Sequence, residues 1–414
     1  MKTGSKRADK AIQVQIGLYK VKNLNKHAII DLIRFTPGGI SRVELARQLG
    51  LTRAAVTTIV NDLLEKNIIC EDERKSAGGR TPIVLEINPK RGRVVGVDIG
   101  ATHANIILAD YSARVIRDYE LPLRIGDGPE VCLQKVDEGL RELLAKESLQ
   151  LSDISAVGVG VPGPVVVEVG LVSAPPIMPG WDNFPIRDRL EELWGCPVTL
   201  NNDAELGALG EWAYGAARGE SNIAYIKVGT GVGAGLLLGG QIYRGSTGSA
   251  GEIGHFTIDE NGPRCSCGNR GCLEAMAGGY AISARAVQQI KAGHRTVLAE
   301  IEPITAITAR DVISAARRGD LVAQQIVIDG GRHLGTAIAS LFNLINPSIV
   351  NVGGGDAQIG DLLLEPIRQS VKARSLRVSS SAVRVTEALL GRRSSGMGAV
   401  VQALTIVLHE LAEA

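Results

Sequence analysis

The chain has 414 residues, which is too long for one ordinary core and predicts two or three domains. Hydrophobic residues make up 45% and charged residues 21%, as in typical globular proteins, and the sequence has no apolar run near the roughly 20 residues of a membrane span. The basic N-terminus is not followed by the apolar segment of a secretory signal, so we expect a cytoplasmic protein with no membrane partner.

Charge is distributed unevenly, although the net charge is only +1. Residues 1–93 contain 18 Lys and Arg against 9 Asp and Glu, whereas residues 94–414 contain 27 against 35. This asymmetry indicates a module that binds nucleic acid, joined to a more acidic body; a basic solvated tail is the simpler alternative. Residues 1–22 show little periodicity and many Lys, and we interpret them as an N-terminal arm.

Three helices are predicted between residues 23 and 66. The first ends at the breakers of residues 35–39, and the second begins at Ser41, which forms a capping-box pattern with Glu44, and ends at Gly50. Thr52 caps the third helix, in which apolar residues at helical spacing form one stripe: Val56, Ile59, Val60, Leu63 and Leu64.

Two strands around a charged tip are predicted within residues 68–87, which makes this unit a winged helix-turn-helix. The alternative is a plain three-helix bundle used for packing. The exposed face of the third helix favours DNA, because its side chains are small or form hydrogen bonds and no carboxylate precedes Asp62. The residues predicted to contact DNA on this helix are Arg53, Thr57, Thr58 and Asn61.

Residues 41–69 and 76–89 resemble the N-terminal winged helix of repressors in the ROK family, which also includes sugar kinases. The resemblance covers about residues 22–90 and implies that the wing contacts the minor groove of DNA through Gly79 and Arg80. Physical chemistry agrees, because glycines let the backbone approach the groove and an Arg is attracted by a narrow A·T-rich minor groove.

The body of the chain repeats a pattern of strand, glycine-containing turn and strand, at residues 94–110 and 224–240, and residues 349–355 add a strand that ends in glycines. Such turns can bind phosphate through backbone N–H groups and Mg²⁺ through a carboxylate, although each motif alone also fits a surface turn. Together they are typical of an α/β actin-like or hexokinase-like ATPase fold with two lobes around a cleft. The predicted nucleotide-binding residues are Asp98, Gly100, Thr102, Thr230, Gly231, Gly233, Gly353 and Gly354.

Three of the six cysteines lie within eight residues, which favours a metal site over a disulfide framework. Residues 251–255 and 265–274 resemble the ROK signature, and the similarity then extends over residues 94–414. One imidazole and three thiolates fit tetrahedral zinc, which would be structural because it has no open position for water. The predicted ligands are His255, Cys265, Cys267 and Cys272, and ordinary buried cysteines are the alternative.

The same resemblance implies a sugar site, in which zinc would fix the loops that carry two carboxylates. It assigns sugar binding to Asn202, Asp203, Glu252, His255 and Glu274. The structural alternatives are an N-cap for Asp203 and a turn for Asn202, after a strand over residues 197–200. In kinases of the family, the residue that matches Asp203 is the general base that removes a proton from a sugar hydroxyl.

Four residues depart from the pattern of these kinases. Ala101, His103 and Ala234 stand where Gly, Lys and Gly are usual, and an added Cβ crowds the approach of phosphate. Ile177 stands where the family commonly has a polar residue before its Pro-Gly-Trp motif. We therefore predict that nucleotide binding is impaired, and the resemblance does not define the identity of the sugar.

These observations predict a sugar-responsive repressor with an arm at residues 1–22, a winged helix at 23–88 and a ROK domain at 89–414. Its expected partners are a pseudo-palindromic DNA operator, a sugar or sugar phosphate, and further copies of the chain in a dimer or a dimer of dimers. The main alternative is a sugar kinase, bifunctional or purely catalytic, that uses Asp203, ATP and Mg²⁺. A zinc scaffold that binds another protein is a third hypothesis.

Overall fold

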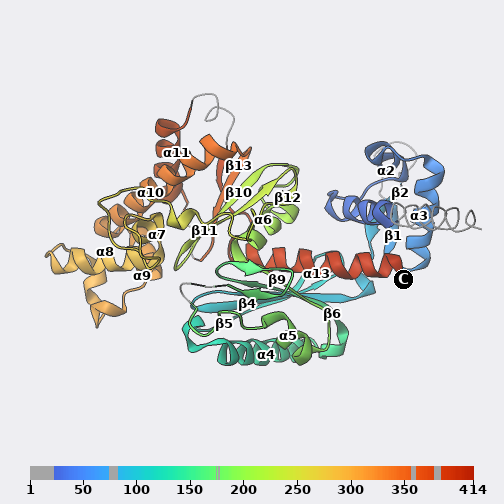
Figure 1. The fold of residues 1–414 in the computed structure, drawn as a ribbon, viewed down its shortest axis with the longest axis horizontal. Coiled ribbons are helices and arrows are strands. Elements are labelled where there is room, and N and C mark those ends of the chain that lie inside the picture. The colour runs from blue at the N-terminus through green and yellow to red at the C-terminus, as the bar shows by residue number, and fades with distance from the viewer. Residues whose placement is uncertain (1–22, 74–82, 174, 176–177, 356–359, 377–383) are drawn as a thin grey trace, which may run out of the picture.

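The computed structural model describes residues 23–73, 83–173, 175, 178–355, 360–376 and 384–414 (Figure 1). A small helical unit is followed by two larger lobes, each built on a five-stranded sheet. The last helix, α13 (Ser394–Glu413), runs from the region between the lobes to the N-terminal unit. The beginning and the end of the described chain therefore lie side by side.

The N-terminal unit confirms the predicted winged helix. A helix over residues 23–35 is followed by α2 (Arg42–Leu49), α3 (Arg53–Glu65) and the antiparallel strands β1 (Ile69–Glu73) and β2 (Ile83–Ile87). Ser41 and Glu44 form the expected capping box, and Gly50 ends α2 in the left-handed conformation. The side chain of Thr52 caps α3 by accepting a hydrogen bond from the backbone N–H of Ala55.

The third helix buries its apolar stripe as predicted, with Leu64 only partly covered at the edge. The predicted arm, residues 1–22, and the tip of the wing, residues 74–82, lie outside the described residues. The buried members of the stripe are Val56, Ile59, Val60 and Leu63.

The first lobe is a mixed sheet with helices on both faces. Its elements are β3 (Arg93–Ile99), β4 (His103–Asp110), β5 (Val115–Pro122), α4 (Pro129–Lys146), β6 (Ile154–Val161), β7 (Val165–Val166), β8 (Leu171–Val172), α5 (Ile186–Trp194) and β9 (Val198–Asn202). The strand order is β5-β4-β3-β6-β9, in which β3 and β4 form the predicted antiparallel hairpin and β6 and β9 extend it in parallel. Helices α4 and α5 cover one face of this sheet and α13 covers the other (Figure 1).

The second lobe repeats this topology. Its elements are α6 (Asp203–Tyr214), β10 (Ile223–Val228), β11 (Val232–Leu238), β12 (Gln241–Ile242), α7 (Leu273–Ala277), α8 (Gly279–Lys291), α9 (Ala309–Arg317), α10 (Leu321–Ile345), β13 (Ile349–Gly353), α11 (Asp361–Arg374) and β14 (Arg384–Glu387). The strand order β12-β11-β10-β13-β14 again places an antiparallel hairpin before two parallel strands. Two lobes of the same topology confirm the predicted hexokinase-like fold.

Helices α6 and α13 pack against each other between the two sheets. Glycines permit this close approach, since a Cβ at Gly210 would lie 2.2 Å from the carbonyl oxygen of Ser394 and one at Gly398 would lie 1.8 Å from that of Leu206. Within the described residues, the segment 391–413 that contains α13 is the one helix long and apolar enough to cross a membrane, but 67% of its apolar window is buried. It is the core helix of a folded protein.

The apolar core of the N-terminal unit continues into α13. Ile29 and Leu63 of that unit belong to the same buried cluster as Val400, Leu404 and Leu408 of the last helix. The unit is thus packed directly against the C-terminal helix, in addition to its covalent connection to β3.

Candidate functional site

A cavity of about 530 Å³ lies between the two lobes. Its walls are the β3–β4 turn, the start of α6, the β10–β11 turn, residues 248–252 and the N-terminal end of α13. A larger cavity of about 900 Å³ lies on the other side of Glu274, against α8, but its walls are mainly apolar. We place the candidate site in the smaller cavity because polar side chains from both lobes converge there.

All five residues predicted to bind sugar line this cavity. They come from segments far apart in the sequence, which the fold brings together between the two lobes. These residues are Asn202, Asp203, Glu252, His255 and Glu274.

The alternative that Asp203 is an N-cap is wrong, because Asn202 has that role. The side-chain oxygen of Asn202 accepts hydrogen bonds from the backbone N–H groups of Ala204 (2.8 Å) and Glu205 (3.1 Å). Its amide nitrogen donates to the backbone oxygen of Gly163 at 3.0 Å. Asn202 therefore fixes the start of α6, which leaves the carboxylate of Asp203 free to face the cavity.

Lys227 is the polar residue at the centre of the site that the sequence analysis missed. Its ammonium group donates to Asp203 Oδ2 at 2.8 Å, to both oxygens of Asp98 at 3.3 Å and to Ser395 Oγ at 3.3 Å. Burial alone would lower the pKa of Lys227, but the charges of Asp203 and Asp98 outweigh it and raise the pKa above its ordinary value. The only signal in the sequence was a single Lys at the end of an otherwise apolar strand.

The carboxylates of Glu252 and Glu274 face the cavity from the second lobe. Burial raises the pKa of Glu252, and the charge of His255 opposes this rise from 3.8 Å away. Glu274 Oε2 accepts a hydrogen bond from the backbone N–H of Val232 at 3.2 Å. Gly231 leaves room for this carboxylate, because a Cβ there would lie 2.4 Å from the same oxygen. Carboxylates held in this way can bridge the hydroxyl groups of a polyol.

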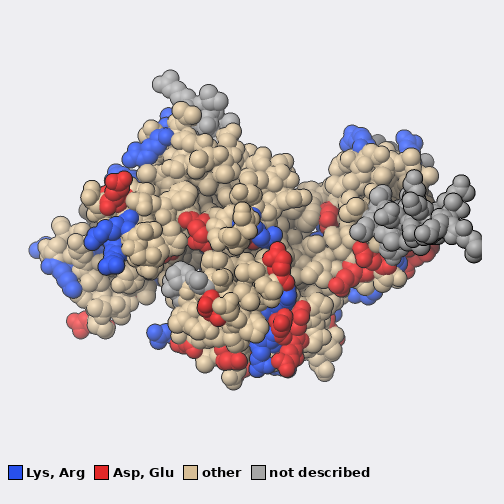
Figure 2. All heavy atoms as spheres, viewed as in Figure 1, with Lys and Arg blue, Asp and Glu red and all other residues tan. Residues whose placement is uncertain are grey.

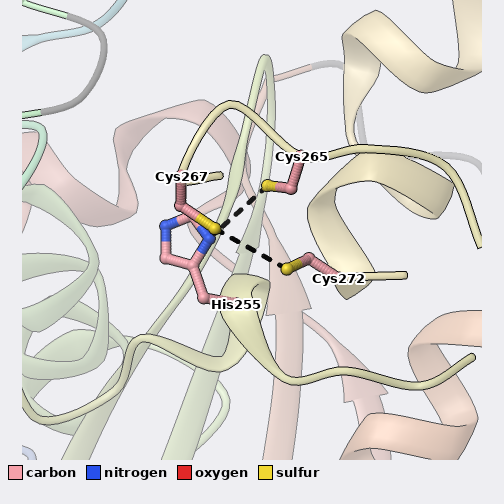
Figure 3. Close-up of side chains that lie close together, drawn as sticks. All are labelled: His255, Cys265, Cys267 and Cys272. Atoms are coloured by element: carbon pink, nitrogen blue, oxygen red, sulfur yellow. Dashed lines mark hydrogen bonds between the residues drawn. The ribbon is translucent and has the colours of Figure 1, made fainter. Parts of the chain in front are cut away.

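The predicted metal ligands form one compact group beside the cavity (Figure 3). Their ligand atoms all lie within 4.8 Å of one another, with Cys267 Sγ 3.7 Å from Cys272 Sγ and Cys265 Sγ 3.8 Å from His255 Nδ1. Zinc–sulfur bonds of about 2.3 Å in a tetrahedron give sulfur atoms about 3.8 Å apart, so the group fits this ion. The set comprises His255, Cys265, Cys267 and Cys272.

Two thiols of this cluster differ in acidity, and a backbone hydrogen bond from Asn269 lowers the pKa of Cys267. Burial and the neighbouring sulfur atoms raise the pKa of Cys272 to about 12. A bound cation opposes the rise at Cys272, because it stabilises the thiolate form that ligates metal. His255 links the cluster to the cavity, since Nδ1 faces the sulfur atoms and Nε2 faces Glu252.

Seven of the eight residues predicted to bind nucleotide line the cavity. The eighth, Gly353, does not line it and packs closely against Ala388 and Tyr225. Amides of both turns already donate within the protein. The N–H of Gly100 donates to the backbone oxygen of His103 at 2.8 Å, and that of Gly229 donates to the backbone oxygen of Gly231 at 2.9 Å. The seven lining residues are Asp98, Gly100, Thr102, Thr230, Gly231, Gly233 and Gly354. Ile177 lies outside the described residues.

The predicted DNA-reading residues of α3 share one exposed face. The hydroxyl of Thr57 donates to the backbone oxygen of Arg53 at 2.8 Å, and that of Thr58 donates to Ala54 at 3.1 Å, so each hydroxyl oxygen can accept from a base or from water. The exposed set is Arg53, Thr57, Thr58 and Asn61, whereas Gly79 and Arg80 lie outside the described residues.

The positive charge predicted for the N-terminal region is concentrated outside the described residues. Over 23–73 and 83–93, nine Lys and Arg are nearly balanced by eight Asp and Glu. The face of this unit shown in Figure 2 accordingly carries both signs of charge. The excess therefore belongs to residues 1–22 and 74–82 of the sequence.

Helix α13 contacts both the cavity and the winged helix. At its N-terminal end, Ser395 donates to the backbone oxygen of Asp203 at 2.8 Å. At its C-terminal end, the backbone oxygen of Ala412 accepts from the ammonium groups of Lys26 (2.9 Å) and Lys66 (3.0 Å). The buried guanidinium of Arg34 donates to Val401 and Thr405 between these points.

Comparison with known proteins agrees with this geometry. Residues 94–406 match the ROK family, and residues 22–69 match a winged helix-turn-helix DNA-binding family. The chain belongs to the ROK family. Among ROK proteins, the xylose repressor of Caldicellulosiruptor bescii is 30% identical over 389 residues, which are 94% of this chain and 97% of the repressor.

Two solved structures of ROK proteins are similar over different shares of the chain. A ROK family transcriptional regulator, a homolog of the E. coli MLC protein, has a TM-score of 0.79 at 28% identity and covers 95% of this chain and 98% of its own. A ROK glucokinase from Streptomyces griseus, in complex with glucose and AMPPNP, has a TM-score of 0.69 at 30% identity and covers 75% of this chain and 99% of its own. The regulator thus matches nearly the whole chain, whereas the kinase matches about three quarters of it.

Proposed function

We propose that this ROK protein is a sugar-responsive transcriptional repressor. The observation that carries the proposal is the position of α13, whose N-terminal end lies at the polar cavity and whose C-terminal end holds the winged helix. A ligand that moves the lobes can therefore change the placement of the DNA-reading helix. A relative named as a repressor and a solved structure named as a transcriptional regulator support this function, because each covers at least 94% of the chain.

In this proposal each segment has a separate role. Residues 1–22 form an arm, residues 23–88 bind DNA, and residues 89–414 bind the effector. Arg53, Thr57, Thr58 and Asn61 read bases, and Gly79 and Arg80 contact the minor groove. Asn202, Asp203, Glu252, His255 and Glu274 form the effector site, with Asn202 acting through its cap on α6.

A structural zinc ion belongs to the same proposal, held by the three thiolates and the imidazole. The compact ligand group supports it, and zinc would supply a rigid link between the loops of Glu252 and Glu274. The effector is a sugar or sugar phosphate, and D-xylose is the first candidate because a similar repressor is named for xylose. We expect a homodimer, or a dimer of dimers, that binds a pseudo-palindromic operator in the cytoplasm.

The test is a DNA-binding assay followed by a titration with sugars. Full-length protein would be used to select operators from a random DNA library, and the selected DNA would then be released by D-xylose, D-glucose, N-acetyl-D-glucosamine or their phosphates. We expect two half-sites in the selected sequences and release by one of these compounds. Failure to enrich any sequence would overturn the proposal.

A sugar kinase is the second candidate function. The carboxylate of Asp203 in the cavity favours it, as does the similarity to the glucokinase. Ala101 opposes it, because it lies at the cavity in the β3–β4 turn that would bind phosphate. Ala234, expected in the second turn, lies instead within β11 and packs in the core of the second lobe. Measurement of sugar-dependent ATP turnover separates the two functions, and we expect none above background from the wild-type protein.

A further inference from the structure

We propose that the ammonium group of Lys227 takes the place of a divalent cation between Asp98 and Asp203, and that this makes the cavity a metal-independent site for an uncharged sugar. The inference rests on the proposed effector site and names the chemical class of the ligand. It concerns a residue that neither the motifs nor the resemblance identified.

The geometry places one cation where two carboxylates meet. Asp98 lies next to the last residue of β3 in the first lobe, whereas Asp203 begins α6 and Lys227 lies near the end of β10 in the second lobe. The Lys227 ammonium lies 2.8 Å from one carboxylate and 3.3 Å from the other. Two carboxylates at this separation attract Mg²⁺ or Mn²⁺ when the space between them is open. Here the ammonium group of Lys227, which is covalently attached to the chain and cannot dissociate, occupies the space between the two carboxylates.

Burial makes the positive charge of Lys227 necessary to this arrangement. The side chains of Asp98, Asp203 and Lys227 are 8%, 13% and 17% exposed. Removing the charge of Lys227 would leave two buried carboxylates without a counter-charge, which is more costly than the pairing itself is worth. Lys227 therefore remains an ammonium ion, which also excludes it as a nucleophile toward the aldehyde of an open-chain sugar.

The ammonium group has no donor left for a ligand. It carries three hydrogens, and its contacts with Asp98, Asp203 and Ser395 use all of them. A phosphate group entering the cavity would therefore gain no hydrogen bond from Lys227. Burial raises the pKa of Asp203, and the charge of the ammonium group held against its oxygen opposes this rise.

The remaining charges of the cavity favour an uncharged ligand. Its walls carry four carboxylates and two cations, and the second cation, Arg392, already donates to Glu120 at 2.8 Å. An excess of negative charge repels a phosphorylated sugar that arrives without a metal ion. The hydroxyl groups of an uncharged sugar, in contrast, can donate to the free lone pairs of these carboxylates. The four carboxylates are Asp98, Asp203, Glu252 and Glu274.

Binding of Mn²⁺ tests the role of Lys227 without any knowledge of the sugar. Zinc-loaded, full-length protein would be titrated with Mn²⁺, and free Mn²⁺ would be followed by electron paramagnetic resonance. We expect no Asp98-dependent binding of Mn²⁺ to the wild type. Lys227→Ala should bind about one Mn²⁺ per chain, at least about tenfold more tightly than any residual Mn²⁺ binds to the wild type. The double variant Lys227→Ala/Asp98→Asn should lose this site, and Lys135→Ala, on the surface of the first lobe, should behave as the wild type.

The wild-type titration also decides the question if Lys227→Ala does not fold. Mn²⁺ binding to the wild type that Asp98→Asn removes would overturn the inference, and so would a folded Lys227→Ala variant that binds no Mn²⁺. Mn²⁺ that restores folding to Lys227→Ala would support it, because a ligand of the native state alone stabilises that state.

A second measurement tests the class of ligand and separates this inference from the proposed function. D-xylose, D-glucose and N-acetyl-D-glucosamine would be compared with D-glucose 6-phosphate and N-acetyl-D-glucosamine 6-phosphate by calorimetry in buffer depleted of divalent cations. We expect an uncharged sugar to bind at least about tenfold more tightly than its phosphate. Tighter binding of a phosphate would overturn the inference and leave the sugar-responsive repressor intact. If none of these compounds bound or changed DNA affinity, the effector function would fail, whereas the Mn²⁺ result would still decide the role of Lys227.

Discussion

Cys267 belongs both to the metal cluster and to the wall of the effector cavity. We expect Cys267→Ser to lose zinc, from about one ion per chain to well below half, because a hydroxyl is a much poorer ligand than a thiolate. The response of DNA binding to sugar should be lost with it, since the loop between Glu252 and Glu274 is no longer fixed. Metal analysis by mass spectrometry measures the first effect and a DNA-release titration the second.

Cys196 provides the matched control for this experiment. It is a free cysteine of the first lobe, distant from the cluster in sequence and structure. Cys196→Ser should retain zinc and the response to sugar. Full zinc content in purified Cys267→Ser would contradict the assignment of this ligand.

Asp203→Asn distinguishes the carboxylate of a sensor from that of a catalytic base. In the proposed repressor, DNA affinity should stay within about twofold, while the sugar concentration for half-release should rise by about tenfold, or 1.4 kcal/mol. The amide keeps one acceptor but loses the charge that pairs with Lys227. Fluorescence anisotropy of labelled operator, with and without sugar, measures both quantities. Robust phosphorylation of sugar by the wild type, abolished in this variant, would instead establish the kinase.

Individual residues show where reasoning from the sequence reached its limit. The ligand set of the metal cluster was predictable because three of its members are close in the sequence. Lys227 was not, because its partners Asp98 and Ser395 are 129 and 168 residues away. Asp203 was the candidate for the N-cap and Asn202 for a turn, and only the path of the backbone decides which of the two side chains reaches the free N–H groups.

The wing and residues 1–22 are the segments in which we expect the electrostatic part of DNA binding to lie, because the described part of the N-terminal unit is nearly neutral. Arg80→Ala should reduce the slope of log affinity against log salt by about 1 and weaken binding most at A·T-rich flanks. Thr57→Ala and Asn61→Ala should instead change base preference by about 1–3 kcal/mol for each lost pairing.

Binding measured at several salt concentrations, on operators with A·T-rich and G·C-rich flanks, tests the role of the wing. Arg141→Ala, an exposed change on α4, is the control and should leave the slope unchanged. An equal loss on both kinds of flank in Arg80→Ala would rule out a minor-groove contact.

The contact between the helix of residues 23–35 and α13 should respond to pH. The rings of His27 and His409 are stacked 3.9 Å apart, with Glu413 and Asp31 as nearby carboxylates. Burial, assisted by His409, lowers the pKa of His27 below 6.5 in spite of Glu413 and Asp31. The unfolded chain therefore binds a proton at His27 more readily than the folded chain, so the free energy of unfolding should decrease as the pH falls through 6.5.

Thermal unfolding between about pH 7 and pH 5.5 measures this effect. We expect the decrease in melting temperature to be smaller in His27→Gln, which keeps a polar side chain but does not titrate. A wild-type protein that becomes more stable as the pH is lowered through this range would show the opposite sign and refute the assignment.

Helices, hairpins and caps of the winged helix and of the two lobes were largely predictable, because each depends on residues close in the sequence. Ser41, Thr52 and Gly50 fix the ends of α2 and α3 by local hydrogen bonds and backbone conformation. The order of strands within each sheet was only implied by resemblance, since parallel pairing joins segments separated by long crossovers.

Coupling between the effector cavity and the DNA-binding unit is a property of the whole molecule, and Arg34 lies on its route. The guanidinium of Arg34 is buried and donates to α13 at 2.9 and 3.0 Å. We expect Arg34→Ala to bind sugar and DNA separately but to lose most of the coupling between them, which is typically worth about 1–3 kcal/mol. The ratio of DNA affinities with and without saturating sugar measures this coupling.

Arg141→Ala is again the matched surface control, and circular dichroism should show that Arg34→Ala remains folded, because loss of the buried contacts costs about 1–3 kcal/mol. An unchanged affinity ratio in folded Arg34→Ala would show that the signal does not pass through this contact.

The contact between Arg34 and α13 was not predictable from the sequence. The sequence of α13 is that of an ordinary apolar helix, and its partners in the N-terminal unit lie more than 300 residues earlier in the chain.

The shared core of α13 and the N-terminal unit also has a consequence for synthesis on the ribosome. Domains generally fold in the order in which they leave the ribosome, the N-terminal one first. Here Ile29 and Leu63 pack in one cluster with Leu404 and Leu408, so the part of the chain made first lacks a portion of its core until the part made last has emerged. The DNA-binding unit should therefore complete its folding only after the effector-binding lobes have been synthesised, and a nascent chain interrupted before residue 394 should not yet occupy an operator.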